Sequence, residues 1–148
     1  MIEPGGIIVA EATEATPEVV QALRDLLPQL SSSAPPLAEE HIREMVASPA
    51  TVVLVARDGT DKIVGTLTLA LFRIPSGLRA WIEDVITDEA ARGQGVGEEL
   101  TRAALEVARN AGARTVDLTS APKREAANRL YERVGFQRRE TNVWRYDL

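Results

Sequence analysis

The stretch ARGQGVGEEL, residues 91–100, decides the fold, because it places a glycine turn directly in front of a helix. Glycine weakens both strands and helices, so Gly93, Gly95 and Gly97 indicate a tight junction between the two. The free N–H groups and partial positive charge of a helix N-terminus attract anions, and missing Cβ atoms let an anion approach the backbone. The turn therefore predicts a phosphate site, to which Arg92 adds a cation. A tight turn without a ligand is the alternative.

The sequence on both sides of this turn alternates between strands and helices. Thr16 and Pro17 begin a helix, Asp58-Gly59 joins two strands of a meander, and Gly112 and Gly135 end two later helices. The expected strands are 7–12, 51–57, 62–72, 78–87 and 114–120, with one or two more in 136–148; the expected helices are 17–30, 36–49, 96–112 and 123–135. The order β-α-α-β-β-β-α-β-α-β predicts an α/β (α+β) fold with a mixed, mostly antiparallel sheet flanked by helices.

Composition excludes several classes of protein. The 148 residues include no cysteine and only one histidine, His41, which we expect on a helix surface. Disulfides, thiolate zinc sites and histidine-rich metal sites are therefore excluded, and we expect no metal. No apolar run approaches the roughly 20 residues of a membrane helix, and the start does not resemble a signal peptide. We expect a cytoplasmic protein with no membrane partner.

Charge is unevenly spread along the chain. The net charge of -5 argues against a nucleic-acid partner, whose phosphates would be repelled. Residues 1–48 hold eight acidic and two basic side chains, whereas residues 123–139 hold six basic and two acidic ones. Solvated helix faces account for both segments most simply.

Two common phosphate motifs fail at the glycine turn, and a third matches. Glu98 stands where the Rossmann fingerprint needs its third glycine, and Glu98-Glu99 replaces the Lys-Ser/Thr of a P-loop. The run Arg92-Gly93-Gln94-Gly95-Val96-Gly97 instead resembles the pyrophosphate loop of the GNAT superfamily of N-acetyltransferases. ANRLYERVGF, residues 127–136, resembles the late helix of that superfamily and its Leu/Phe-Tyr-Glu-x-x-Gly-Phe ending. The two motifs stand in the order and at the spacing that the family shows.

The resemblance implies acetyl-CoA as the co-substrate. In the family the loop backbone holds the pyrophosphate and the preceding strand pairs with the pantetheine arm, so backbone N–H groups near Val85 and Ile86 would also meet the developing oxyanion. The implied cofactor-binding residues in these two segments are Val85, Ile86, Thr87, Arg92, Gly93, Gln94, Gly95, Val96 and Gly97. Glu98 and Glu99 depart from the usual pattern, and we expect both to point outward, since they would otherwise repel a pyrophosphate.

The late helix carries the candidate catalytic acid. The resemblance places Tyr131 beside the sulfur of CoA, where a positioned phenol of pKa about 10 can protonate a thiolate. Packing in the core is the alternative for this residue. Asn128 and Arg124 share its helical face and are candidate cofactor contacts, the amide to pantetheine and the arginine to a phosphate. Family members often carry asparagine at the position of Arg124, so Asn128 is not a direct match.

The strand before the turn carries the candidate base. Glu83 and Asp84 fall on opposite faces of this strand, and a partly buried carboxylate there would readily accept a proton. A salt bridge, or proton transfer through water, is the alternative. The Ile-Glu-Asp stretch resembles the amino-sugar-phosphate branch of the superfamily. Asp84, Thr119 and Trp144 are the candidate substrate-binding residues, although Trp144, like Tyr146, is more simply read as a packing residue.

These observations predict an enzyme that transfers an acetyl group from acetyl-CoA to a primary amine of a small molecule or peptide, by direct attack in a ternary complex. The acidic first segment favours a cationic amine. We expect one domain over 1–148: an acceptor side in 1–50, the central sheet and CoA loop in 51–120, and the late helix and last strands in 121–148. A homodimer through those strands is plausible. The alternatives are a non-catalytic acyl-CoA sensor or interaction module of the same fold, and a nucleotide-binding protein.

Overall fold

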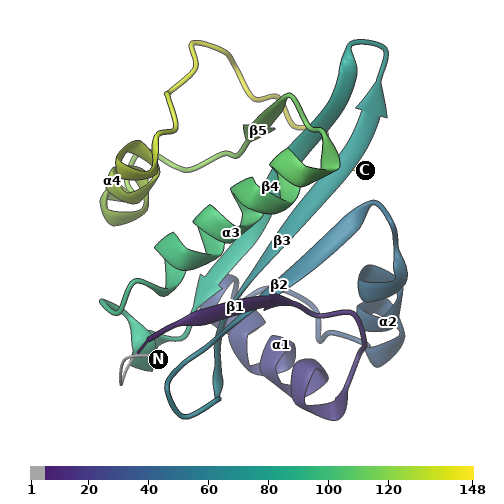
Figure 1. Cartoon of the computed structure of the whole chain (residues 1–148), viewed down its shortest axis with the longest axis vertical. Helices are drawn as coiled ribbons and strands as arrows, with labels where there is room; N and C mark the ends of the chain where they lie inside the picture. The colour runs from purple at the N-terminus through teal and green to yellow at the C-terminus, as the bar shows by residue number, and fades with distance from the viewer. Residues whose placement is uncertain (1–5) are drawn as a thin grey trace.

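A five-stranded sheet in the order β1-β2-β3-β4-β5 forms the centre of the computed structural model, which describes residues 6–148 (Figure 1). The first four strands are antiparallel neighbours, and the last one pairs with β4 in parallel. The strands are β1 Ile8–Glu11, β2 Thr51–Arg57, β3 Ile63–Ile74, β4 Gly77–Thr87 and β5 Thr115–Asp117. The predicted mixed, mostly antiparallel sheet is thus confirmed.

Helices cover both faces of this sheet. They are α1 Pro17–Leu30, α2 Glu39–Ala47, the short 3-10 helix η1 Glu89–Ala91, α3 Val96–Ala111 and α4 Glu125–Val134. Val52, Leu54 and Ala56 of β2 pack in one core with α3, while Val53 and Val55 pack in a second core with α1 and α2. The alternation of β2 therefore separates the two layers, as a strand buried on both faces requires.

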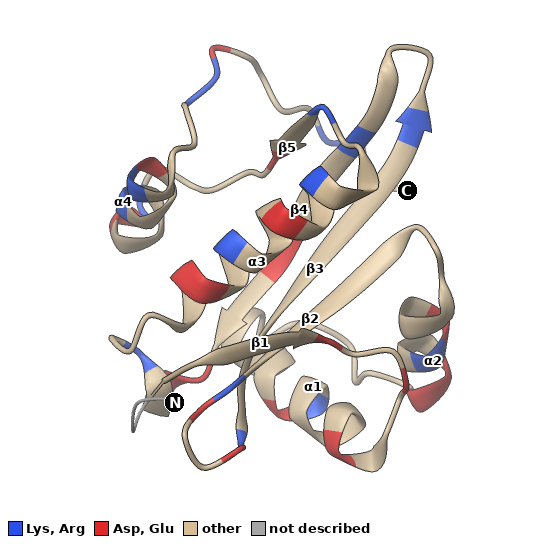
Figure 2. Cartoon of the chain, viewed as in Figure 1, with Lys and Arg blue, Asp and Glu red and all other residues tan. Residues whose placement is uncertain are grey.

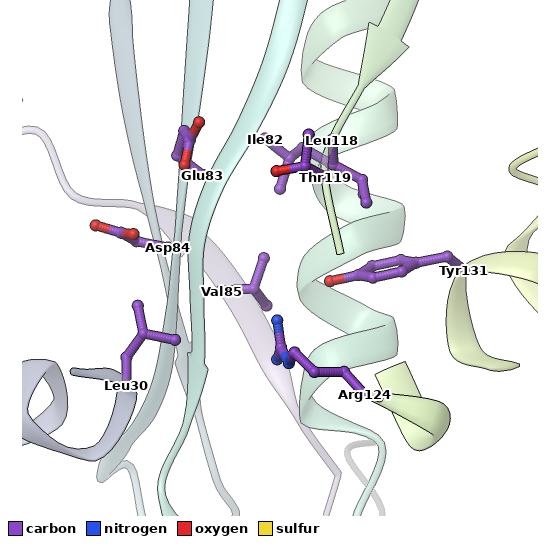
Figure 3. Close-up of a pocket in the computed structure, with 9 residues that line it drawn as sticks. All are labelled: Leu30, Ile82, Glu83, Asp84, Val85, Leu118, Thr119, Arg124 and Tyr131. Atoms are coloured by element: carbon purple, nitrogen blue, oxygen red, sulfur yellow. The ribbon is translucent and has the colours of Figure 1, made fainter. Parts of the chain in front are cut away.

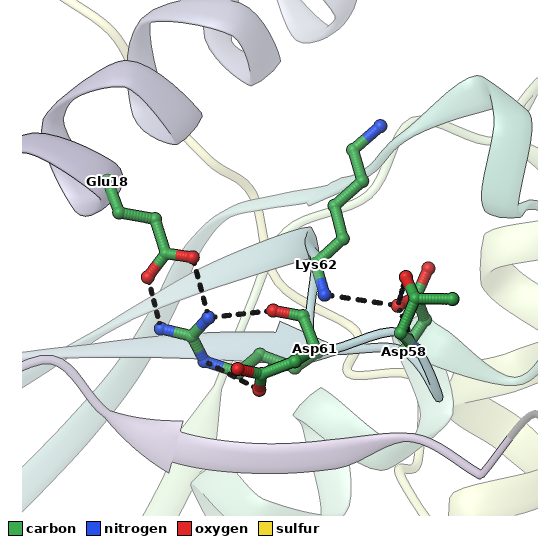
Figure 4. Close-up of polar contacts among 6 residues, drawn as sticks. Glu18, Asp58, Asp61 and Lys62 are labelled. Atoms are coloured by element: carbon green, nitrogen blue, oxygen red, sulfur yellow. Dashed lines mark hydrogen bonds and ion pairs between the residues drawn. The ribbon is translucent and has the colours of Figure 1, made fainter.

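Side chains fix the start of α1. Thr16 caps the helix by accepting a hydrogen bond from the backbone N–H of Val19 at 3.2 Å, and Pro17 follows it, as the sequence predicts. Arg57 of β2 donates two hydrogen bonds to Glu18, at 2.6 and 2.9 Å, and one to the backbone carbonyl of Asp61 (Figure 4). These contacts hold the start of α1 against the β2–β3 turn.

The charged segments lie on different parts of the molecule. Figure 2 shows mostly acidic residues among the charged positions of α1 and α2, and basic residues together with acidic ones on α4. His41 is exposed on α2, as expected.

Among residues 6–148, no helix is both long enough and apolar enough to cross a membrane. In the same part of the chain, no three metal-ligating side chains lie close enough together to hold a metal ion.

The end of the chain differs from the prediction. Residues 136–148 form no strand, although one or two were expected there. Trp144 and Tyr146 are 88% and 86% exposed, so reading them as packing residues was wrong for this single chain. A strand is stable only beside a neighbour that takes up its backbone hydrogen bonds, and this segment has no such neighbour among the described residues.

Candidate functional site

The glycine turn leaves the start of α3 open. Gly93 and Gly95 have φ of +80° and +81°, the left-handed region that favours glycine, and a Cβ on either would meet nothing within 4 Å. Gly95 is the N-cap, and no side chain of the described residues caps α3, in contrast to α1. The first N–H groups of this helix therefore face open space without a side-chain acceptor, which is the arrangement that binds an anion.

A cleft of about 740 Å³ extends from this turn along β4 to α4. It brings together most of the predicted cofactor-binding residues, because the turn, the end of β4 and the start of α4 converge there. Those that line it are Val85, Ile86, Thr87, Arg92, Gly93, Gly95, Val96, Gly97 and Arg124. Gly97 also allows the two helices to approach closely, since a Cβ on it would lie 3.3 Å from Leu130 of α4.

Two predicted residues do not line this cleft. Gln94 is exposed in the turn and is not part of the cleft wall. Asn128 donates its amide N–H to the backbone carbonyl of Ala121 at 3.0 Å, with a longer contact to that of Pro122. The structure thus gives Asn128 a role in holding the loop between β5 and α4.

Glu98 lines the cleft, and the expectation that it points outward was wrong. Its carboxylate accepts hydrogen bonds from Arg133 at 2.9 Å and from Arg102 at 3.3 Å. These arginines, Arg133 first, lower the pKa of Glu98. The paired charge repels a phosphate less than a free carboxylate would, and the contact also ties α4 to α3. Glu99 is exposed, as expected.

Tyr131 extends from α4 across the cleft toward β4. Figure 3 shows its hydroxyl directed toward Val85, with the guanidinium of Arg124 beside it. Its ring meets Phe136 edge to face, with 5.7 Å between centroids. Burial raises the pKa of Tyr131, and the positive charge of Arg124 offsets part of that rise. The phenol is therefore protonated at neutral pH, and its hydroxyl lies in the cleft.

A second, smaller cavity of about 140 Å³ adjoins the cleft. The two share four lining residues: Leu30, Val85, Arg124 and Tyr131. Glu83, Asp84 and Thr119 line only the smaller cavity. A molecule in the cleft and another in the small cavity would thus meet beside the hydroxyl of Tyr131.

A bulge in β4 brings the two carboxylates to the same cavity. Thr66 pairs with Ile86 and Thr68 with Glu83, so β4 has one residue more than β3 between these pairs. Asp84 accommodates the extra residue with φ of +47°, which is uncommon for a residue other than glycine. Glu83 and Asp84 were expected on opposite faces of a regular strand, and at this bulge both border the same cavity. In Figure 3 Val85 points toward Tyr131, whereas Asp84 extends to the other side of β4.

Glu83 is held by a neighbour on its own strand. The indole N–H of Trp81 donates to Oε1 of Glu83 at 2.8 Å. Glu83 is exposed, so the expectation of a partly buried carboxylate was wrong. The alternative of a salt bridge fails too, because no Lys or Arg of residues 6–148 pairs with it.

Two residues of the site, Leu30 and Arg133, were not expected there, and Trp144 was expected there but lies elsewhere. Leu30 enters from the end of α1, far away in sequence, and only the packing of α1 beside β4 brings it in. Arg133 stands two residues after Tyr131 in the recognised motif, where its charge could have signalled a pair with Glu98. Trp144, expected at the acceptor pocket, lines neither cavity.

Comparisons with known proteins agree with this geometry. The family model "Acetyltransferase (GNAT) family" matches residues 17–136. The chain is 33% identical over 138 residues to glucosamine 6-phosphate N-acetyltransferase 1 of Oryza sativa subsp. japonica, covering 87% of this chain and 81% of the relative. It is 39% identical over 71 residues to N-alpha-acetyltransferase 30 of Schizosaccharomyces pombe, covering 48% and 47%.

A solved structure supports the same assignment. The crystal structure of an acetyltransferase of Trypanosoma brucei superposes with a TM-score of 0.77 at 29% identity, covering 96% of this chain and 99% of that one. The family model spans the turn, β4 and α4, which are the elements that build the two cavities. The chain belongs to the acetyltransferase (GNAT) family.

Proposed function

We propose that this acetyltransferase transfers the acetyl group of acetyl-CoA to a primary amine of a small molecule or peptide, by direct attack in a ternary complex. The observation that carries the proposal is the junction of the two cavities at Val85, Arg124 and Tyr131. One cavity leads to the uncapped start of α3, and the other contains two carboxylates.

The larger cleft suits the cofactor. Its far end offers backbone N–H groups at the start of α3 and the exposed cation of Arg92, which match a diphosphate. Val85 to Thr87 supply strand backbone along the cleft wall for the pantetheine amides. Among residues 6–148, no β-strand pairs with this half of β4 on the β5 side, because β5 pairs only with Arg79 to Trp81.

The smaller cavity suits the amine. Glu83 and Asp84 supply negative charge that would attract an ammonium group and accept its proton, directly or through water. The two curated relatives are named for an amino sugar phosphate and for N-alpha-acetylation, and both descriptions imply acylation of a primary amine. We therefore propose a primary amine as acceptor, with both carboxylates and Thr119 as its contacts.

The chemistry then needs one proton acceptor and one proton donor. The amine nitrogen attacks the thioester carbon, a C–N bond forms, and the C–S bond breaks. The ammonium proton goes to Glu83 or to water, and Tyr131 protonates the departing thiolate. The bulge at Asp84 leaves strand backbone unpaired at Val85, where an N–H group would stabilise the oxyanion.

A thiol-release assay tests this proposal. Acetyl-CoA would be offered with glucosamine 6-phosphate, a peptide with a free N-terminus, spermidine and an aminoglycoside. We expect release of CoA with at least one amine, and a fall in kcat of about 10²-fold in Tyr131→Phe, since positioned general acids contribute about that much. Tyr146→Phe, which changes the only other tyrosine, is the matched control and should keep full activity.

The same assay separates the enzyme from the alternatives. Binding of acetyl-CoA without release of CoA for any amine would favour a non-catalytic acyl-CoA-binding module. Thermal stabilisation by ATP or NAD, with none by acetyl-CoA, would favour a nucleotide-binding protein.

A further inference from the structure

Leu30 is a large apolar side chain that stands outside both cores. It is the last residue of α1 and is 39% exposed, whereas Leu23 and Leu26 of the same helix are 5% and 2% exposed. A single exposed leucine needs no explanation by itself. Leu30, however, borders both the cleft and the smaller cavity, so it stands where bound substrates would cover it.

Two hydrogen bonds hold the end of α1 in place. Oε1 of Gln29, the neighbour of Leu30, accepts from the backbone N–H of Glu89 at 2.9 Å. The backbone N–H of Ser31 donates to the carbonyl of Leu27 at 3.0 Å and closes the last turn of the helix. Glu89 begins η1, which leads into the glycine turn. The backbone of Leu30 is therefore tied to the segment that forms the proposed cofactor site.

The proposed reaction gives each group on the attacked carbon a different neighbour. That carbon carries the oxyanion, the sulfur, the amine nitrogen and the carbon chain of the acyl group. The proposed function assigns the oxyanion to the backbone at Val85, the sulfur to Tyr131 and the nitrogen to the smaller cavity. Figure 3 shows Leu30 and Tyr131 on opposite sides of Val85 in this view. Because Arg124, which also borders both cavities, is charged, Leu30 is the side chain left to contact the acyl carbons.

We propose that Leu30 determines the acyl specificity: its side chain contacts the methyl group of the acetyl donor and leaves no room for a longer acyl chain. This inference rests on the proposed function. The smaller cavity holds about 140 Å³, and a cavity of about 150 Å³ accommodates a molecule the size of benzene. The amine occupies the same space, so little remains for further acyl carbons. A closed apolar pocket discriminates against one extra methylene by about 10–200-fold.

The acyl preference of Leu30→Ala tests the proposal. Thiol release would be measured with acetyl-, propionyl- and butyryl-CoA and the best amine. The unmodified protein should prefer acetyl-CoA over butyryl-CoA by about 100-fold or more in kcat/KM, and Leu30→Ala by less than about tenfold. Leu30→Met, which is close in volume, should keep the preference. Leu27→Ala, one turn earlier on α1 and outside both cavities, is the matched control and should keep it too.

A second variant separates the acyl contact from the wall of the amine cavity. Leu118 lines the smaller cavity but not the cleft. Leu118→Ala should therefore change KM for the amine and leave the acyl preference as it is. An unchanged preference in Leu30→Ala, or a preference lost in Leu118→Ala instead, would overturn the proposal.

Calorimetry gives a readout that does not depend on turnover. Butyryl-CoA should bind Leu30→Ala about tenfold or more tightly than it binds the unmodified protein, whereas CoA without an acyl group should bind the two equally. Absence of thiol release with every amine would contradict the proposed function, and the affinities would still decide the role of Leu30. Equal affinity of the two proteins for butyryl-CoA would refute that role.

Discussion

The indole N–H of Trp81 and the carboxylate of Glu83 form a 2.8 Å hydrogen bond along one face of β4. The two residues stand two positions apart, so their side chains point the same way. The bond engages one oxygen of Glu83 at the wall of the smaller cavity. Trp81 therefore acts through Glu83: it holds the carboxylate in one orientation for the proposed proton transfer.

Trp81→Phe should lower kcat with little change in KM for either substrate. A hydrogen bond to a charged group contributes about 1.5–3 kcal/mol, less where it is exposed, so a loss of about 1 kcal/mol and a fall of about fivefold are expected. Steady-state kinetics with the best amine measures both constants. Trp144→Phe, at the only other tryptophan, is the control and should leave both unchanged. An equal loss in the two variants would speak against the positioning role.

The pair of Tyr131 and Arg124 makes a prediction about pH. Burial raises the pKa of Tyr131 above 10.0, and Arg124 lowers it in part. A general acid works only while protonated, so the titration of Tyr131 should make the activity fall at alkaline pH. Arg124→Gln removes the positive charge, which should raise the pKa further and move the alkaline limb of kcat to higher pH. Arg124→Lys should keep the limb near its original place. A shift of the alkaline limb of kcat to lower pH in Arg124→Gln would contradict the role of Tyr131 as the general acid.

The sequence predicted the fold through local signals and missed what depends on long-range contact. Thr16, Pro17 and the glycines that end α3 and α4 set helix ends through their own caps, so those elements were predictable. The bulge at Asp84 could not be read from alternation, because it appears only in the register against β3. The last strand was predicted from its pattern, but a strand also needs a partner, and the part of the chain that the structure describes provides none.

In the candidate site too, features that rest on short motifs were predictable, whereas those that rest on long-range contacts were not. The residues of the glycine turn and Tyr131 belong to short motifs, and the fold brings them to one cleft. Leu30 and the pairing of Glu98 with Arg133 arise from packing between elements distant in sequence, 35 residues apart for the ion pair. Glu98 was expected to point outward because a free carboxylate would repel the pyrophosphate, but Arg133 pairs with it and balances its charge.

The proposed diphosphate site at the glycine turn can be tested by comparing an alanine substitution at the start of α3 with one at the end of the same helix. Gly95 and Gly112 both have positive φ, +81° and +87°, and a Cβ on either meets nothing within 4 Å. Alanine at either position should therefore lower the free energy of unfolding by a similar amount, about 1–2 kcal/mol. Only Gly95→Ala places its Cβ where the diphosphate would lie, and we expect it alone to weaken acetyl-CoA binding, by about tenfold or more. Calorimetry measures affinity, and denaturant unfolding measures stability. Equal affinities in the two variants would refute the proposed diphosphate site.

The contact between Glu18 and Arg57 predicts how stability depends on pH. Hydrogen bonds from Arg57 lower the pKa of Glu18 below its ordinary value of 4.5. A carboxyl group whose pKa is lower in the folded state stabilises the fold fully above its unfolded value, and that stabilisation disappears as the pH falls through the folded value. Glu18→Gln should thus lower Tm at pH 7, and the difference from the unmodified protein should close as the pH drops below 4.5.

Glu39→Gln provides the matched control for this measurement. Glu39 also pairs with an arginine, Arg43 at 3.1 Å, but both side chains are largely exposed on a single helix. Exposed pairs of this kind contribute little, so Tm should change less at pH 7 than in Glu18→Gln. Melting curves of the three proteins from pH 7 to pH 3 supply the comparison. A constant difference between the unmodified protein and Glu18→Gln across that range would show that the ion pair is not what joins α1 to the β2–β3 turn.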